Sequence, residues 1–176
     1  MSEPAIRIAS HVDDAWNSML WSQFGAAIDM LENAIDACPD ALWGDRSRQP
    51  EFWYVAYHTL FFLDLYSHGT LDGFAPPAPF TLDEIDPAGI LPPRVYTKDE
   101  LRAYLRHGRE RCRAAIHALT DESARRICTF PWLQLSRGEL LLDNLRHVQH
   151  HAAQLNLILR QQTDSAPGWV ARAREG

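Results

Sequence analysis

The chain has 176 residues and a formal net charge of −6. This length predicts a single domain, 1–176, with a substantial core. The acidic balance and the lack of a Lys/Arg run argue against nucleic-acid binding. No stretch reaches about 18 apolar residues, and the N-terminus lacks a basic region followed by an apolar segment, so we expect a soluble, cytoplasmic protein with no membrane partner.

The three cysteines, Cys38, Cys112 and Cys128, form no CxxC pair and leave an odd thiol. This spacing indicates neither a disulfide framework nor a cysteine zinc site. Cys38 and Cys112 fall on the apolar faces of expected helices. We therefore interpret both as core residues.

The first helix is expected over 10–38. Ser10 is a candidate N-cap, Asp13 is an acid favourable to the helix dipole, and Pro39 stops the helix. Its apolar residues recur at steps of four and three: Trp16, Leu20, Phe24, Ala27, Leu31, Ile35 and Cys38. A turn-rich connection over 39–49 follows.

The second helix is expected over 50–69, with Pro50 as its first residue. Apolar residues lie nearly all round it, which indicates burial against several neighbours or a partner chain. His58 lies among aromatic residues on this helix. A buried imidazole needs a hydrogen-bond partner or a metal. The simpler interpretation is a core histidine bonded to a tyrosine or a backbone carbonyl.

The segment 69–96 holds more than half of the prolines and cannot be one helix. A short turn is possible at Leu82–Asp86. A connection of this length can run the full height of a helical bundle. It would let the helices on either side of it lie parallel.

The third helix begins at a capping box formed by Thr97 and Glu100 and continues to about Leu119. Five arginines are spread around its polar faces: Arg102, Arg106, Arg109, Arg111 and Arg113. We interpret them as a solvated face with ion pairs to a neighbouring acid or a partner, and binding of an anionic substrate is the alternative. His107 and His117 lie off the apolar seam and are expected to be exposed.

After a connection over 120–135, whose second half is expected to be extended with Trp132 folding over one end of the bundle, comes a fourth helix over 136–162. Ser136 and Glu139 form its capping box. Its apolar seam is Leu141, Leu145, Val148, Ala152, Leu155 and Leu159. In the tail 163–176, which we expect to be partly flexible, Trp169 is expected to dock while the charged end frays.

A polar stripe runs beside this seam through Asn144, His147, His151 and Gln154. His147 and His151 are one turn apart, so their Cβ atoms lie about 5–6 Å from each other. Neutral imidazoles on successive turns can bind one Zn²⁺, Ni²⁺, Cu²⁺ or Fe²⁺ ion. Two ligands alone are too few, and without a third the pair is an ordinary surface feature.

Four amphipathic helices, the long link between the second and third, and the HVQHHAAQ sequence together resemble the DinB-like superfamily. That family's signature of His, three residues, His, then Gln three further on matches His147, His151 and Gln154. Its third ligand lies in the middle of the second helix and matches His58. Many members carry Arg-Gly between the second His and the Gln, where this chain has two alanines. His150 competes as a ligand.

The resemblance implies an all-α fold, a four-helix bundle with a long crossover between helices 2 and 3. It also implies a divalent metal ion, zinc or nickel, held by His58, His147 and His151, and a homodimer. Each ligand should donate its other ring nitrogen to an acceptor. The candidate acceptors are Asp143, Asn144 and Gln154.

Two classes of function follow. The first is a metal-dependent enzyme: a thiol-dependent S-transferase acting on a low-molecular-weight thiol and an electrophilic small molecule, or a metal-dependent hydrolase. A thiol at an open metal position is deprotonated and nucleophilic. The second is a non-catalytic, stress-related or ligand-binding helical bundle with a structural or vestigial metal site. In one form of it, the aromatic wall of the second helix binds an apolar ligand.

Overall fold

The computed structural model describes residues 9–47 and 49–174, with side chains described from residue 14 onward. The fold is mostly helical, as expected, with one small sheet. In chain order the elements are α1 (Ala9–Ala37), α2 (Asp40–Trp43), α3 (Phe52–His68), the 3-10 helix η1 (Leu82–Ile85), α4 (Lys98–His117), α5 (Asp121–Arg125), β1 (Ile127–Phe130), β2 (Leu133–Ser136) and α6 (Arg137–Thr163).

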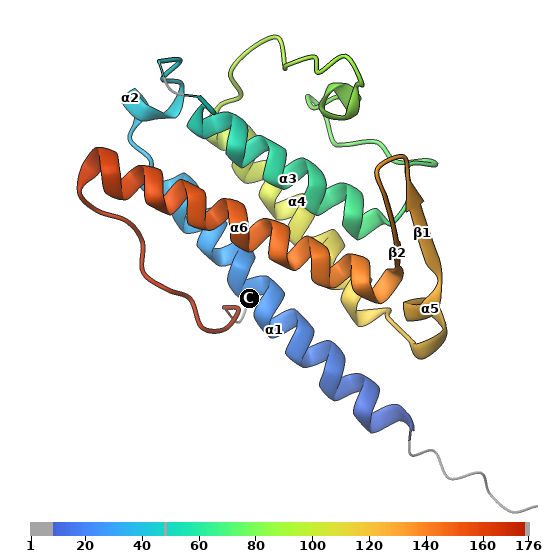
Figure 1. Ribbon diagram of the computed structural model, residues 1–176. Coiled ribbons are helices and arrows are strands. Elements are labelled where there is room, and N and C mark those ends of the chain that lie inside the picture. Colours follow the sequence, from blue (N-terminus) through green and yellow to red (C-terminus); the bar gives the residue numbers. More distant parts are fainter. Residues whose placement is uncertain (1–8, 48, 175–176) are drawn as a thin grey trace, which may run out of the picture.

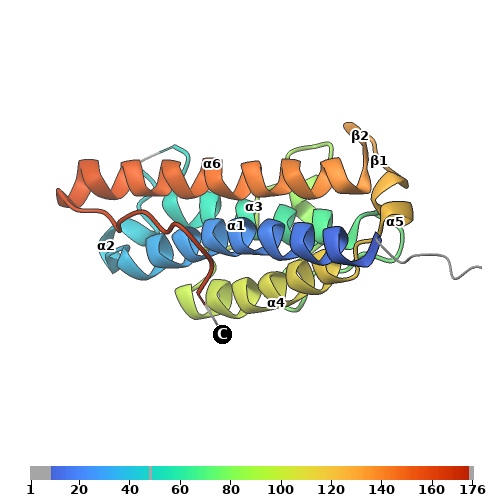
Figure 2. The same cartoon turned by 90° about the horizontal axis from the view of Figure 1, so that it is seen from below.

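Four long helices lie side by side (Figure 1). α1 packs against α4 and α6, and α3 packs against the same two helices. α3 and α4 run in one direction, and α1 and α6 run in the other (Figure 2). The long segment between α3 and α4 makes this parallel pair possible, as predicted. None of the described helices combines the length and the apolar character that crossing a membrane would require.

The core lies where the apolar faces of the four long helices meet. α3 is buried over most of its length, in agreement with its apolar circumference. On α1 the predicted seam is buried from Leu20 to Cys38, but Trp16 is 49% exposed. The first turns of α1 project away from the other helices (Figure 1), and Trp16 belongs to this early part of the helix.

The local signals for helix starts were mostly right. Both predicted capping boxes are present, at Thr97 before α4 and at Ser136 before α6. The turn predicted at Leu82–Asp86 is η1. Pro50 is not the first residue of α3, because the N-cap is Glu51, whose extended backbone separates the proline from the helix. The capping proposed for Ser10 and Asp13 concerns side chains outside the described residues.

The second half of the 120–135 connection is extended, as predicted, and forms a hairpin. β1 and β2 pair antiparallel, with Phe130 opposite Leu133. Only Pro131 and Trp132 separate the two strands, so the hairpin tip carries the indole of Trp132. This ring lies edge-on to Phe62 of α3, with 6.2 Å between ring centroids, as expected for a residue that covers one end of the helices.

The docking predicted for Trp169 in the C-terminal tail is wrong. Trp169 is 72% exposed and does not dock. The charged end is held instead, because the backbone N–H of Ala173 donates to the carbonyl of Ser22 at 2.8 Å. The backbone N–H of Arg174 donates to the buried carboxylate of Asp29, also at 2.8 Å. Backbone hydrogen bonds to α1 thus place the tail, rather than burial of its one large aromatic ring.

The arginines of α4 are not simply a solvated face. Arg102 pairs with Asp36 of α1 at 2.8 Å, and Arg109 pairs with Asp29 at 2.7 Å. Arg111 reaches Asp64 of α3 at 3.1 Å. These ion pairs join α4 to both of its neighbours. The simple polar and apolar pattern of a single helix contains no information about such partners.

Asp64 is the centre of a buried polar cluster between α3 and α4. Its side chain is fully buried. Besides Arg111, it meets the ring Nε2 of His107 at 3.3 Å and accepts a hydrogen bond from the hydroxyl of Tyr104 at 3.3 Å. Burial raises the pKa of the Asp64 carboxyl, and the charge of Arg111 opposes that shift. His107, expected to be exposed, therefore faces a buried acid.

We predict that Arg111→Leu destabilises the protein, because it leaves the buried carboxylate of Asp64 without its main partner. The expected loss in the free energy of unfolding is about 3 kcal/mol. Adding Asp64→Asn to this variant removes the buried charge and should restore part of the loss. Urea denaturation of both variants measures the difference. A double variant no more stable than Arg111→Leu would contradict this role for Asp64.

Candidate metal site

The structure brings together all three histidines that the sequence singled out. His58 of α3 and His147 of α6 face each other, with 3.2 Å between their Nε2 atoms. His151 lies one turn further along α6, and one nitrogen from each ring lies within 4.8 Å of the others. Among the described residues, these three form the only group of His, Cys, Asp or Glu side chains with this geometry.

The packing of α3 on α6 creates this group. The helical repeat places His147 and His151 on one face of α6. One turn earlier on the same face, Asn144 is buried and donates from its amide nitrogen to the backbone carbonyl of Leu63 at 3.2 Å. This bond ties α6 to α3 beside the site. It therefore helps to set the position of α6 along α3, and with it the position of the two histidines relative to His58.

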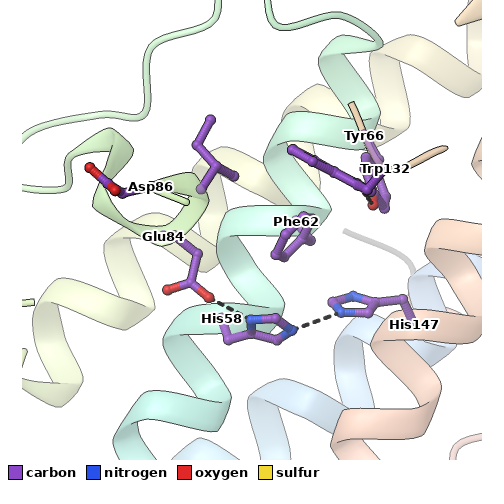
Figure 3. A pocket seen from close by; sticks show the side chains of 8 residues that line it. His58, Phe62, Tyr66, Glu84, Asp86, Trp132 and His147 are labelled. Atoms are coloured by element: carbon purple, nitrogen blue, oxygen red, sulfur yellow. Dashed lines mark hydrogen bonds and ion pairs between the residues drawn. The ribbon is translucent and has the colours of Figure 1, made fainter. Parts of the chain in front are cut away.

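Glu84 of η1 also belongs to the site, and sequence reasoning missed it. Its Oε1 lies 2.6 Å from Nδ1 of His58 and accepts a hydrogen bond from the hydroxyl of Tyr54 at 3.2 Å. Its side chain is only 3% exposed. A neutral His58 that donates from Nδ1 to this carboxylate presents the lone pair of Nε2 toward His147 (Figure 3). The only signal in the sequence was an acid within a predicted short turn.

His147 and His151 differ in the hydrogen-bond partners of their Nδ1 atoms. Nδ1 of His151 lies 2.7 Å from the side-chain oxygen of Gln154, which confirms Gln154 as a partner. Nδ1 of His147 is buried and has no hydrogen-bond partner among the described residues. Asn144 donates hydrogen bonds to α3, and Asp143 pairs with an arginine on its own helix. Neither of these two candidates supports a ligand.

His150 does not compete for the site. It is exposed and lies outside the group of three, although its ring centroid is 5.0 Å from that of His151. Its position, three residues after His147, turns it away from α3. The helical repeat explains this, because Asn144 and His151 fall on one side of His147 around the helix and His150 falls on the other.

Burial keeps the two α6 histidines neutral. It lowers the pKa of His147 to about 3, with a further contribution from the neighbouring imidazoles, of which His151 is the largest. Burial also lowers the pKa of His151 to about 4, and its bond to Gln154 opposes this shift. At neutral pH both rings therefore have an unprotonated nitrogen, which is the form that binds metals.

The donor set fits a divalent metal ion. Two imidazole nitrogens, each about 2.0–2.1 Å from one tetrahedral ion, lie about 3.4 Å apart. The observed separation between His58 and His147 is 3.2 Å. Three imidazoles suit zinc, nickel, copper or iron, and they leave at least one coordination position free.

A cavity of about 390 Å³ opens beside the histidines (Figure 3). α3, the hairpin and α6 form one wall of it, and η1 forms the other. Its lining residues are His58, Phe62, Tyr66, Glu84, Ile85, Asp86, Trp132 and His147. This volume suits a small organic molecule, and the lining is mostly aromatic with a few polar groups, as is usual for ligand pockets.

Comparison with known proteins identifies the family of the chain. The family model described as the DinB superfamily matches residues 23–155, a span that contains His58, His147 and His151. Comparisons with curated proteins and with solved structures gave no significant match. Because the family match covers most of the chain, the protein belongs to the DinB superfamily.

Proposed function

We propose that this protein binds one divalent metal ion through His58, His147 and His151 and acts as a thiol-dependent S-transferase. Its four long helices would form the four-helix bundle expected for the family and hold the ligands in place. One observation carries the proposal. Imidazoles from two helices distant in sequence meet beside a cavity large enough for a small molecule.

The residues around the site have separable roles in this proposal. Glu84 holds the ring of His58 and is a positioning residue, because it contacts the ligand rather than the substrate. Phe62 and Trp132 give the cavity its apolar lining. A divalent ion on neutral ligands keeps its full charge and would lower the pKa of a thiol or water that binds to it. We assign no general base.

The lining of the cavity favours thiol transfer over hydrolysis. Phe62, Tyr66 and Trp132 present mostly apolar surface next to the histidines. Such a lining favours contact with the apolar surface of an electrophile, whereas a hydrolase needs an ordered water at the reacting centre. A low-molecular-weight thiol and an electrophilic small molecule are therefore the proposed partners, and zinc or nickel is the proposed metal.

We expect the purified protein to hold one metal ion per chain, and His58→Ala and His147→Ala to lose it, because two imidazoles bind a metal much more weakly than three. Elemental analysis of each variant after dialysis measures the metal content. His150→Ala is the matched control, since His150 lies on α6 outside the group. Equal metal content in all four proteins would contradict the site.

The same proteins test the chemistry. The metal-loaded protein should consume a low-molecular-weight thiol in the presence of an electrophile, and the chelator-stripped protein should not. Turnover that needs the metal supports the transferase. A metal-loaded protein without turnover contradicts the transferase and favours a structural site. Ligand binding that survives metal removal, again without turnover, would favour the apolar-ligand alternative.

Glu84→Ala should weaken metal binding, because His58 loses the acceptor that orients its ring. Removing such a partner typically reduces metal affinity by about 10- to 100-fold. Glu84→Gln keeps an oxygen that can accept from Nδ1 of His58, so its loss should be smaller. Competition with a chromogenic chelator measures the affinity. Asp83→Ala, one residue away on η1, is the control and should bind metal as the wild type does.

The metal-free protein should lose stability as the pH falls below about 6.5, where the imidazoles of the unfolded chain become protonated. His147 and His151 stay neutral in the folded state down to about pH 4, because their folded-state pKa values are about 3 and 4. Their contribution is thus complete above pH 6.5. After allowance for partial exposure to solvent, the free energy of unfolding should fall by about 1–2 kcal/mol between pH 7 and pH 5.

Urea denaturation at the two pH values measures this loss. The double variant His147→Asn/His151→Asn should lose less stability over the same interval, because its asparagines do not titrate. An equal loss in both proteins would show that other groups cause the pH dependence.

A further inference from the structure

We propose that the side chains of the cavity beside the three histidines favour a neutral, planar, apolar electrophile over a carboxylate. That the bound molecule is an electrophile rests on the proposed function. The preference for a flat and uncharged molecule rests on the cavity alone, so the two can be tested separately.

An aromatic surface begins at the histidines and continues along α3. His58, Phe62 and Tyr66 are spaced by four residues and therefore lie on one stripe of the helix. The ring centroid of Phe62 is 4.9 Å from that of His58, 5.5 Å from that of His147 and 5.2 Å from that of Tyr66. A flat molecule on this stripe would reach from the aromatic wall to the nitrogen atoms of the histidines.

Trp132 extends this wall from the hairpin tip. Its indole N–H donates to the hydroxyl of Tyr66 at 2.9 Å, and its ring stacks on Phe130 with 5.7 Å between centroids. These contacts hold the ring in place, yet Trp132 is still 45% exposed. A fixed aromatic face left open at a cavity can be covered by a planar ligand. Tyr66 accepts the indole N–H and keeps its own hydroxyl hydrogen for a polar group of that ligand.

The charge of the cavity argues against anionic substrates. Glu84 and Asp86 supply its only formal charges, and no lysine or arginine is found among the described residues that line it. Neither carboxylate has an ion pair with a lysine or arginine in the described part of the chain, unlike Asp29 and Asp64 in the core. A carboxylate in the cavity would therefore meet two negative charges that no lysine or arginine of the lining balances. A neutral molecule of the same shape would not.

The test compares 4-nitrobenzamide with 4-nitrobenzoate, two flat molecules of nearly the same shape that differ in charge. Calorimetry measures the Kd of each for the 176-residue chain after metal removal, because a bound metal would itself attract the carboxylate. We expect the amide to bind about tenfold more tightly, as for a modest electrostatic difference in a partly open site. In ¹H–¹⁵N spectra, the amide should shift the indole N–H signal of Trp132.

Two variants and one control test which side chains of the cavity cause the preference. Trp132→Leu keeps an apolar side chain at the hairpin tip but removes the flat ring, so the amide should bind about two- to tenfold more weakly. Trp169→Leu is the matched control, because Trp169 is 72% exposed in the tail and does not line the cavity. Asp86→Asn removes one negative charge, and it should therefore strengthen binding of the carboxylate while leaving binding of the amide unchanged.

The outcomes separate this inference from the proposed function. The inference is overturned if the metal-free protein binds the carboxylate as tightly as the amide, or if Trp132→Leu and Trp169→Leu behave alike. If the protein holds no metal but prefers the amide, the inferred selectivity of the cavity stands and the proposed enzyme function is wrong. If the protein holds metal and turns over thiol but does not prefer the amide, the proposed enzyme function stands and the inferred selectivity is wrong.

Discussion

The contact between α3 and α6 is the interaction on which the site depends. It brings Nε2 of His58 to within 3.2 Å of Nε2 of His147, although the two residues are 89 positions apart in the chain. The same contact buries the α6 histidines and keeps them neutral. Asn144, bonded to a carbonyl of α3, maintains the alignment. The packing of the two helices thus sets both the geometry of the imidazoles and their protonation state.

Segments outside the four long helices complete the site. The connection between α3 and α4 supplies Glu84, which orients His58, and the hairpin between α5 and α6 supplies Trp132, which covers one side of the cavity. The helices form a rigid frame, and the connections add the chemistry that surrounds the donors. This division is common, because loops can change without disturbing the core that positions them.

The buried charged side chains outside the site hold the long helices together rather than contribute to the site. Asp64 and Asp29 each face an arginine of α4, so that helix is joined to α3 on one side and to α1 on the other. These acids are compensated, whereas the two carboxylates of the cavity have no such partner among the described residues. Charge is thus balanced where helices pack and left uncompensated where a ligand would enter.

The sequence by itself determined the four long helices, two capping boxes and the grouping of His147, His151 and Gln154, because these depend on short-range spacing along a helix. The family resemblance added His58. The short helices α2 and α5 lie in segments that were expected to be connections. Only the tertiary structure decided the role of Glu84, the ion pairs of Arg109 and Arg111, and the exposure of Trp169. Each of these depends on which residue of a distant segment lies opposite. Helical periodicity shows which side of a helix is apolar, but the partner across an interface is set by the packing of the whole chain.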